Sequence, residues 1–230
     1  ERMPLSLLDD VYKTVQDPFL GLEALALASI VEQSRLSATL RSLPAIPGLA
    51  EDDDSKLSLA RTWLRCWRRN GFWLAHMPPV WWKRPSSQGV SIKGQRARFE
   101  AMKRVIKDRT ALRAFNDTWH PQLISAFCDD VSGEARLRGV QLSLAFDGPW
   151  VRCADCKSVY RPIPTVHHCV ECEGTNVAPL DPWTDTVFRA RKGYYRLPTE
   201  LALGQPSEPP MAIIAAEHTA QLNTAQADEV

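Results

Sequence analysis

The sequence predicts an α+β fold, in which a mainly helical N-terminal body precedes a small β-rich module. Apolar residues in the first half of the chain recur with the period of a helix, as Leu8, Val11 and Val15 illustrate. Residues 140–146 instead alternate between apolar and polar side chains, and four cysteines follow within a short stretch. We therefore expect a helical domain over residues 1–132, a β-rich module over residues 133–205 and a linker with a further element over residues 206–230.

Size and charge set the first limits on function. The chain has 230 residues and a formal net charge of +1, so it can bury a core without disulfides and its bulk charge indicates no partner. The chain starts at Glu1 without a charged segment leading into an apolar one, so we expect no signal peptide. Residues 18–31 are apolar but contain Glu23 and are too short to span a bilayer. We expect a cytoplasmic protein with no membrane contact.

Three helices are predicted before residue 71. Residues 5–16 have one apolar face, whereas residues 19–33 are apolar nearly all round, which is typical of a buried helix. A loop with Pro44, Pro47 and Gly48 separates them from a helix over residues 55–70, whose tryptophans Trp63 and Trp67 we expect in the core.

Three consecutive acidic residues precede that last helix. Asp52, Asp53 and Asp54 can be interpreted as a metal site or as an N-cap with favourable charges near the helix dipole. We favour the cap, because no further carboxylates converge on them in the sequence.

The middle of the chain predicts a long helix over residues 93–113, with a continuation to residue 131 that breaks at Pro121. A strand is expected over residues 140–146, and an extended aromatic segment over residues 181–196. Residues 211–216 (MAIIAA) read as a short buried strand, and residues 217–230 as the start of a helix.

The four clustered cysteines form two Cys-x-x-Cys pairs. Their spacing is Cys153-x2-Cys156-x12-Cys169-x2-Cys172, and each pair makes a tight turn that directs two sulfurs to one point. Two such turns supply the four-thiolate shell that Zn²⁺ accepts, joined by a spacer that suits a hairpin. We therefore expect a small β-rich zinc ribbon with one structural Zn²⁺, and a glycine turn at Gly174.

Other metal chemistry remains open at this stage. His167 and His168 stand directly before Cys169, and either of them can replace a cysteine as a ligand. A reversible dithiol or an iron–sulfur cluster also uses paired cysteines, although the symmetry of the two pairs favours zinc.

A basic segment suggests a nucleic-acid surface. Between Lys83 and Arg113 there are ten Lys or Arg residues and two acidic ones, and a stripe of this kind can follow phosphates. The two tryptophans before it can stack on bases, whereas the opposing interpretation is a solvated helix face and a buried aromatic pair. The candidate DNA contacts are Trp81, Trp82, Lys93, Arg96, Lys103, Arg104 and Lys107.

Catalytic motifs are missing from the sequence. We find no phosphate-binding loop of the form G-x-x-x-x-G-K-[ST] and no G-x-S-x-G nucleophile elbow. His76, His120 and His218 are scattered, without a nucleophile or carboxylate at a fixed offset. The chain is therefore not expected to be catalytic alone.

Several segments resemble large bacterial superfamily 2 DNA helicases. These segments read WVRCADCKSVY, HHCVEC, FRARKGYYRLP and AAEHTAQLN, with weaker likeness in DPFLGLEALALA and WLRCWRRNGFWL. The chain looks like the region between the two motor domains of MrfA-like repair helicases and of phage-defence helicases of the DISARM and Druantia type. The resemblance covers residues 15–230 and is strongest over residues 150–222.

The resemblance implies that residues 206–230 hold a linker and the start of a second RecA-like motor domain. It also implies that ATP and Mg²⁺ act only in the parent protein, because no ATP-binding residue can be placed here. The phrase Glu217–Leu222 resembles one that lies just before that motor domain in the large defence helicases. Thr219 there can cap a helix, and His218 or Gln221 can touch a DNA phosphate through that helix terminus.

Three functions compete on this basis. The first is a zinc-stabilised, DNA-contacting accessory segment of an ATP-dependent helicase in an anti-phage defence system. The second is a protein–protein docking module of a multi-subunit defence or repair complex without direct DNA contact. The third, a zinc-dependent regulator or nuclease subunit, lacks the expected constellation of carboxylates and histidines.

Overall fold

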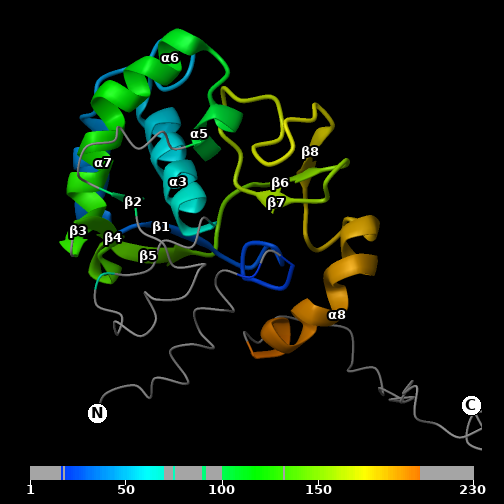
Figure 1. Ribbon diagram of the computed structural model, residues 1–230. Coiled ribbons are helices and arrows are strands. Elements are labelled where there is room, and N and C mark those ends of the chain that lie inside the picture. The colour runs from blue at the N-terminus through cyan, green and yellow to red at the C-terminus, as the bar shows by residue number, and fades with distance from the viewer. Residues whose placement is uncertain are drawn as a thin grey trace, which may run out of the picture.

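The fold is α+β, as the sequence predicts. The computed structural model describes residue 17, residues 19–69, residue 75, residues 90–91, residues 100–131 and residues 133–202. Most helices gather on one side of the molecule with two small antiparallel sheets below them, and the third sheet and one further helix lie on the other side (Figure 1). The predicted elements at residues 5–16, 211–216 and 217–230 fall outside the described residues.

The helical body is built around one long helix, α3 (Asp53–Arg69), beside the shorter α2 (Ser34–Arg41). Within the described residues, no helix is both long and apolar enough to cross a lipid bilayer. The later helical elements are α5 (Glu100–Val105), α6 (Arg109–Ala114), the π-helical turn Phe115–Trp119 and α7 (His120–Phe127).

In the described part of the chain three antiparallel sheets accompany the helices, and two of them join residues far apart in the sequence. β1 (Ser29–Glu32) pairs with β5 (Leu142–Ala145), so that Ser29 lies opposite Ala145. In this way strand pairing crosses residue 132, where the sequence suggests a domain boundary. The second sheet has the order β2 (Val90–Ser91), β4 (Glu134–Leu137), β3 (Cys128–Val131), and the third β7 (Val159–Tyr160), β6 (Trp150–Cys153), β8 (Val177–Leu180).

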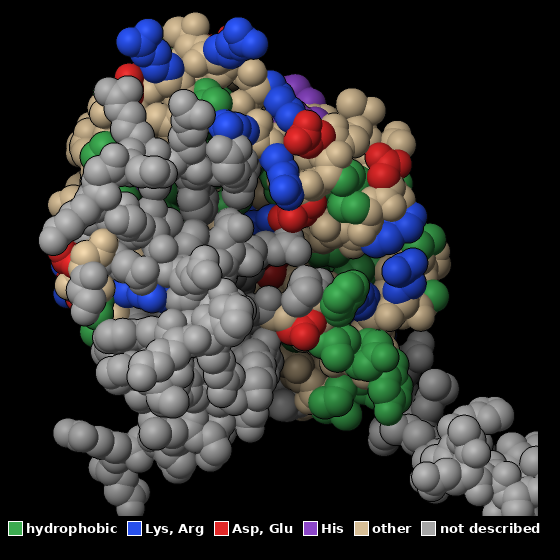
Figure 2. Space-filling model, in the orientation of Figure 1, with side chains coloured by type: hydrophobic (Ala, Val, Ile, Leu, Met, Phe, Trp, Pro, Cys, Tyr) green, Lys and Arg blue, Asp and Glu red, His purple; other side chains and the backbone are tan. Residues whose placement is uncertain are grey.

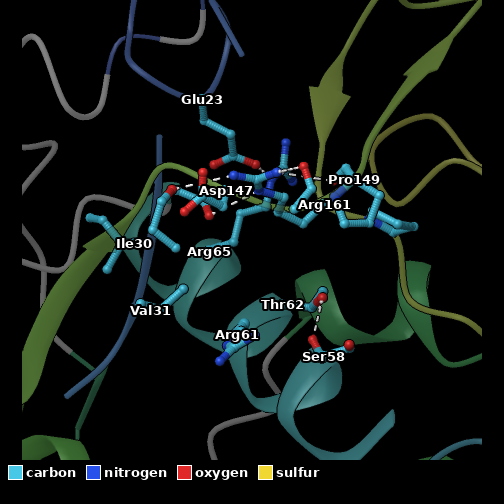
Figure 3. Close-up of a pocket in the computed structure, with 14 residues that line it drawn as sticks. Glu23, Ile30, Val31, Ser58, Arg61, Thr62, Arg65, Asp147, Pro149 and Arg161 are labelled. Atoms are coloured by element: carbon cyan, nitrogen blue, oxygen red, sulfur yellow. Dashed lines mark hydrogen bonds and ion pairs between the residues drawn. The ribbon is translucent and has the colours of Figure 1, made fainter. Parts of the chain in front are cut away.

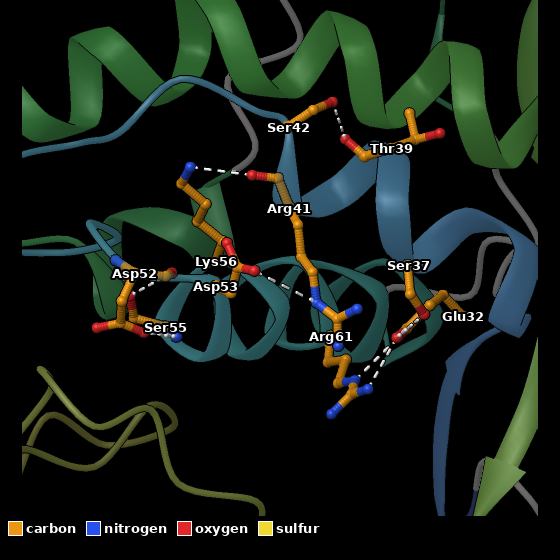
Figure 4. Close-up of polar contacts among 10 residues, drawn as sticks. All are labelled: Glu32, Ser37, Thr39, Arg41, Ser42, Asp52, Asp53, Ser55, Lys56 and Arg61. Carbon is orange, nitrogen blue, oxygen red and sulfur yellow. Dashed lines mark hydrogen bonds and ion pairs between the residues drawn. The ribbon is translucent and has the colours of Figure 1, made fainter.

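The acidic triplet before α3 is a cap, which confirms the interpretation favoured from the sequence (Figure 4). The carboxylate of Asp52 accepts a hydrogen bond from the backbone N–H of Ser55 at 2.8 Å. In return, the hydroxyl of Ser55 accepts one from the N–H of Asp52 at 3.1 Å, which makes a reciprocal capping pair. The carboxylates of Asp53 and Asp54 lie in the first helical turn, where the helix dipole favours negative charge.

Aromatic side chains fill the core between α3 and α7. Trp63 and Trp67 are fully buried, as expected, with their ring centroids 4.6 Å apart. The indole N–H of Trp63 donates to Nδ1 of His120 at 3.0 Å, and the indole N–H of Trp119 donates to the carbonyl of Pro44 at 2.9 Å. Each of these two buried indoles thereby keeps a polar partner.

The predicted buried helix over residues 19–33 is wrong in type, although half of its apolar residues are buried. One helical turn ends at Ala26, which has a φ of 51°. The N–H of Leu27 bonds to the carbonyl of Leu22 at 2.8 Å, and the N–H of Ala26 to that of Glu23 at 2.9 Å, which is the hydrogen bonding of a helix C-terminus. The chain then extends into β1, because its β-branched residues pair with a strand from the far end of the sequence.

The predicted helix over residues 93–113, with its continuation to 131, is discontinuous in its described part. α5 ends at Val105, and the carboxylate of Asp108 starts α6 by accepting from the N–H of Ala111 at 2.7 Å. The π-helical turn precedes Pro121, which lacks an N–H and is accommodated at the start of α7. At Cys128 the chain becomes β3 instead of remaining helical.

Two further predictions concern the second half of the chain. The predicted strand over residues 140–146 is confirmed as the shorter β5, which follows the 3₁₀ turn Gly139–Gln141. The extended segment predicted over residues 181–196 is wrong, because most of it forms the helix α8 (Thr186–Ala202). Asp185 caps this helix by accepting from the N–H of Phe188 at 2.8 Å. Its aromatic residues suggested a strand, but its buried residues Phe188, Arg196 and Glu200 recur at helical spacing.

Burial of His120 makes the stability of the fold pH-dependent. Desolvation lowers the pKa of His120 to about 4 from its usual value near 6.5. Between these two pH values the unfolded chain binds a proton that the folded chain excludes, so stability falls as the pH drops from 6.5 toward 4. We expect a loss of roughly 1.4 kcal/mol per pH unit within this window, measured by urea unfolding at fixed excess metal.

The variant His120→Asn is the matched control, since an amide oxygen can still accept from Trp63 but does not titrate. Its stability profile should lose this slope, and identical profiles for the two proteins would contradict the assignment.

Candidate metal centre

The first Cys-x-x-Cys pair forms a turn at the end of β6. The N–H of Lys157 donates to the carbonyl of Cys153 at 3.1 Å, and the N–H of Cys153 donates to the carbonyl of Ser158 at 3.0 Å. Lys157 adopts a left-handed φ of 64°, which folds the chain back so that Cys156 and Cys153 face the same point.

The second pair repeats this geometry residue for residue. The N–H of Glu173 donates to the carbonyl of Cys169 at 2.9 Å, and the N–H of Cys169 donates to the carbonyl of Gly174 at 2.7 Å. The left-handed residue is Glu173, with a φ of 66°, and not Gly174 as a glycine turn would require. The requirement for glycine at position 174 is steric instead, because a Cβ there would lie 2.3 Å from a carboxylate oxygen of Asp155 and 3.4 Å from the sulfur of Cys172.

The two turns bring all four sulfurs together. The four Sγ atoms of Cys153, Cys156, Cys169 and Cys172 lie within 4.8 Å of one another. The closest pairs connect the two turns, at 3.7 Å between Cys153 and Cys172 and 3.6 Å between Cys156 and Cys169. Disulfides require about 2.05 Å, so these are four free thiols around one centre.

This spacing fits a tetrahedral metal ion. A metal–sulfur bond of about 2.3 Å places tetrahedral ligands about 3.8 Å apart, close to the distances between the two turns. Cys153 and Cys169 are buried while Cys156 and Cys172 are exposed, so the centre lies at the edge of the core. The cluster can therefore hold one metal ion, and four sulfurs complete a shell without an open position for chemistry.

Local hydrogen bonds favour the thiolate form of one of the two exposed cysteines, Cys156. Desolvation alone would raise the pKa of Cys156, but hydrogen bonds from the hydroxyl and the N–H of Ser158 lower it to about 7. The ring of His168 is held elsewhere, since its Nε2 lies 2.7 Å from the carbonyl of Arg104. The four cysteines thus form the cluster without this histidine.

An ion-pair network fastens the second turn to the helical body. Arg65 of α3 pairs with Glu171, which lies between the two cysteines of that turn, and with Glu23 of the N-terminal loop. Its guanidinium also lies over the ring of Tyr160 in β7, 5.3 Å from the centroid. Only 10% of the Arg65 side chain is exposed, and the two carboxylates raise the pKa of its guanidinium against the opposing effect of burial.

Two residues of the predicted basic stripe contact the same turn. Lys107 pairs with Glu173, and the guanidinium of Arg104 donates to the carbonyl of Glu171 at 3.5 Å. Lys103 is exposed on α5, the short helix that also carries Arg104. The other candidate nucleic-acid contacts, namely Trp81, Trp82, Lys93, Arg96, His218, Thr219 and Gln221, lie outside the described residues.

A cavity of about 140 Å³ lies beside this network and is lined by Arg61, Arg65 and Arg161 (Figure 3). Its charges are largely compensated within the chain. Arg61 binds both carboxylate oxygens of Glu32 at 2.8 Å, and Arg161 donates to Ser29 and to four backbone carbonyls. Since Asp147 and Glu23 also line the cavity, it is not an anion site.

Sequence reasoning missed the role of Arg65. Its one visible signal is the spacing of four residues between Arg61 and Arg65, which places two cations on one face of a helix with a buried side. The partners Glu23 and Glu171 lie far away in the sequence, so no local pattern could identify them.

Comparisons of the chain with protein-family models, curated proteins and solved structures found no match. The function is therefore inferred from the residues of the chain itself.

The Arg65 network yields a stability prediction. Substituting Arg65→Met removes the cation and leaves two largely buried carboxylates without it, which should cost roughly 3–5 kcal/mol. Urea unfolding of the metal-loaded protein measures this loss. The exposed Arg113→Met on α6, whose side chain is 85% exposed, is the control and should cost under about 0.5 kcal/mol. Equal stabilities for the two variants would show that the network does not hold the turn.

Proposed function

We propose that this chain is a zinc-stabilised accessory segment of an ATP-dependent DNA helicase, that it contacts DNA, and that it is not catalytic alone. The observation that carries the proposal is the four-sulfur centre built from two equivalent turns. A closed thiolate shell of this kind stabilises structure and leaves no position for a reacting water.

Zinc is the proposed metal for chemical reasons. Four thiolates in two symmetric turns suit its tetrahedral, redox-inactive coordination. The binding energy of such a site is folding energy, on the order of 10 kcal/mol. Because Glu171 lies within the second turn and pairs with Arg65, that energy also supports the contact between the ribbon and α3.

The DNA contact is proposed for the surface of α5 and α6. Lys and Arg side chains gather at the end of the molecule where α6 lies (Figure 2). The exposed cations there are Lys103, Arg104, Lys107, Arg109 and Arg113. The metal-bound turn would hold part of this surface in place, since Arg104 and Lys107 both contact it.

The parent protein is proposed from the resemblance of residues 150–222 to bacterial superfamily 2 helicases. In that setting the motor domains would bind ATP and Mg²⁺, and this segment would lie between them. A role in anti-phage defence and a cytoplasmic location belong to the same proposal.

A second candidate is a protein-docking module without DNA contact. Two observations favour it: the charges of Arg104 and Lys107 are partly engaged by the turn, and large apolar side chains are exposed on α8. DNA-binding measurements separate these two candidates.

Metal analysis tests the centre. The purified chain should contain one zinc per molecule, and Cys169→Ser should reduce that content and lower the melting temperature strongly, because the serine hydroxyl is a poor zinc ligand. Cys128→Ala removes a buried cysteine outside the cluster and should keep one zinc. Protein without stoichiometric metal, or with iron, would contradict the proposal.

DNA binding is expected to depend on salt and on the α5–α6 surface. The double variant Lys103→Glu and Arg109→Glu avoids the two residues that contact the turn. It should weaken binding by about tenfold or more and reduce the slope of log K against log salt by about 1–2. Fluorescence anisotropy with single- and double-stranded oligonucleotides measures both quantities.

The control for this experiment carries the same charge change on α2 and α3, through Arg41→Glu and Lys56→Glu. Equal effects from both double variants would indicate bulk charge, and no binding by the native chain would favour the docking module.

A further inference from the structure

α8 has an outward face that is almost entirely apolar. Val187, Tyr194, Tyr195 and Leu201 are 49%, 61%, 48% and 46% exposed. At 100° per residue these four positions occupy one side of the helix, together with the exposed Ala190 and Pro198. We call Val187, Tyr194, Tyr195 and Leu201 the α8 face.

The rest of α8 is firmly attached to the molecule, so the orientation of the α8 face is fixed. Phe188 packs with Trp150 and Leu180 of the ribbon. The guanidinium of Arg196 is buried, pairs with Glu200 at 2.7 Å and donates to the carbonyls of Leu25 and Ala26. These contacts leave the apolar residues no alternative but to face outward.

Further exposed apolar side chains lie around α8. Phe19, Leu20 and Trp183 are exposed as well, and Lys192 of α8 donates to the carbonyl of Phe19. These residues and the α8 face account for seven of the ten large apolar side chains exposed in the described part of the chain. Hydrophobic side chains accordingly gather where α8 lies in Figure 2. Concentrated apolar surface of this kind marks an interaction site.

The exposed charges that α8 itself presents beside the face are positive, whereas the exposed Asp17 and Asp181 lie beside Phe19, Leu20 and Trp183. Arg191 lies within the exposed side, flanked by Val187, Tyr194 and Tyr195 at helical spacing, and no described residue forms an ion pair with it. Lys192 borders the face. Its ammonium group donates to the backbone carbonyl of Phe19 and lies near the ring of that residue. Glu200, the one acidic residue of α8, is buried in its pair with Arg196. A partner that covers the α8 face therefore contacts Arg191, which favours negative charge on that partner.

We propose that the α8 face docks an acidic amphipathic helix of a partner protein. Val187, Leu201 and the two tyrosines are spaced along the sequence so that they share one side of α8. Side chains arranged in this way allow ridge-into-groove packing of a second helix. From Val187 to Leu201 the face covers about 21 Å of helix, with Pro198 inside it, and a partner helix of about four turns has this length. Carboxylates flanking the apolar stripe of that helix meet Arg191 and Lys192. This surface is separate from the DNA surface proposed on α5 and α6.

The test uses two synthetic helical peptides of about 18 residues, long enough to cover the α8 face. Both carry leucines at helical spacing, and the flanking positions are glutamate in one and lysine in the other. We expect the full chain to bind the glutamate peptide at least tenfold more tightly in fluorescence anisotropy. Equal binding of both peptides, or of neither, would overturn the proposal.

Single substitutions then locate the contact. Tyr194→Ser and Leu201→Ser should each weaken binding of the glutamate peptide by about tenfold, and Arg191→Glu should remove most of the preference for it. Phe146→Ser, at an exposed apolar residue after β5, is the matched control and should bind like the native chain. Loss of folding would be seen in the melting temperature, and all four residues are exposed enough to keep it close to native.

Competing occupants give different results. Self-association through the face would appear as a dimer in sedimentation that Tyr194→Ser dissolves, and a nucleic-acid site would appear as oligonucleotide binding that Tyr194→Ser abolishes. Either result would overturn the docking of an acidic helix.

Discussion

The guanidinium of Arg65 is the contact on which the arrangement of the molecule depends. It joins helix α3, the N-terminal loop at Glu23 and the second cysteine turn at Glu171, while stacking over Tyr160 of the ribbon. A charge this deeply buried is tolerated only because two carboxylates surround it, so each of the three segments needs the others in place. The four cysteines order the turn that carries Glu171, and the aromatic core orders the helix that carries Arg65. Metal coordination and core packing thereby become one cooperative unit.

The cysteine cluster could be predicted from the sequence because its geometry is local. Each turn is determined within six residues, from Cys153 to Ser158 and from Cys169 to Gly174, so spacing alone predicts which sulfurs converge. The cap at Asp52 and the helix that follows it are local in the same sense. Patterns confined to one turn or one helix can be predicted from the sequence, because they do not depend on contacts with the rest of the chain.

The errors arise where distant residues decide the outcome. Residues 19–33 are apolar enough for a buried helix, but β5 offers a strand partner, and the guanidinium of Arg196 donates to the carbonyls of Leu25 and Ala26 at the end of the helical turn. The aromatic residues of α8 suggested a strand, but its true signal is the spacing of the buried Phe188, Arg196 and Glu200, two of which are charged. A search for hydrophobic periodicity overlooks a helix face whose buried residues are an ion pair. It also wrongly counts as buried an apolar residue that is exposed, such as Tyr194.

The pairing of β1 with β5 has a consequence for how the chain can fold during synthesis. β1 leaves the ribosome before its only described strand partner, which is made after the entire helical body. Until then the backbone N–H and C=O groups of β1 lack the hydrogen bonds of a strand pair. Closing so long a loop is entropically slow, and an open strand edge is exposed to other nascent chains in the meantime. For the same reason, if the two halves on either side of residue 132 were expressed separately, β1 and β5 would each lack the strand that they pair with. The two halves should therefore be expressed together.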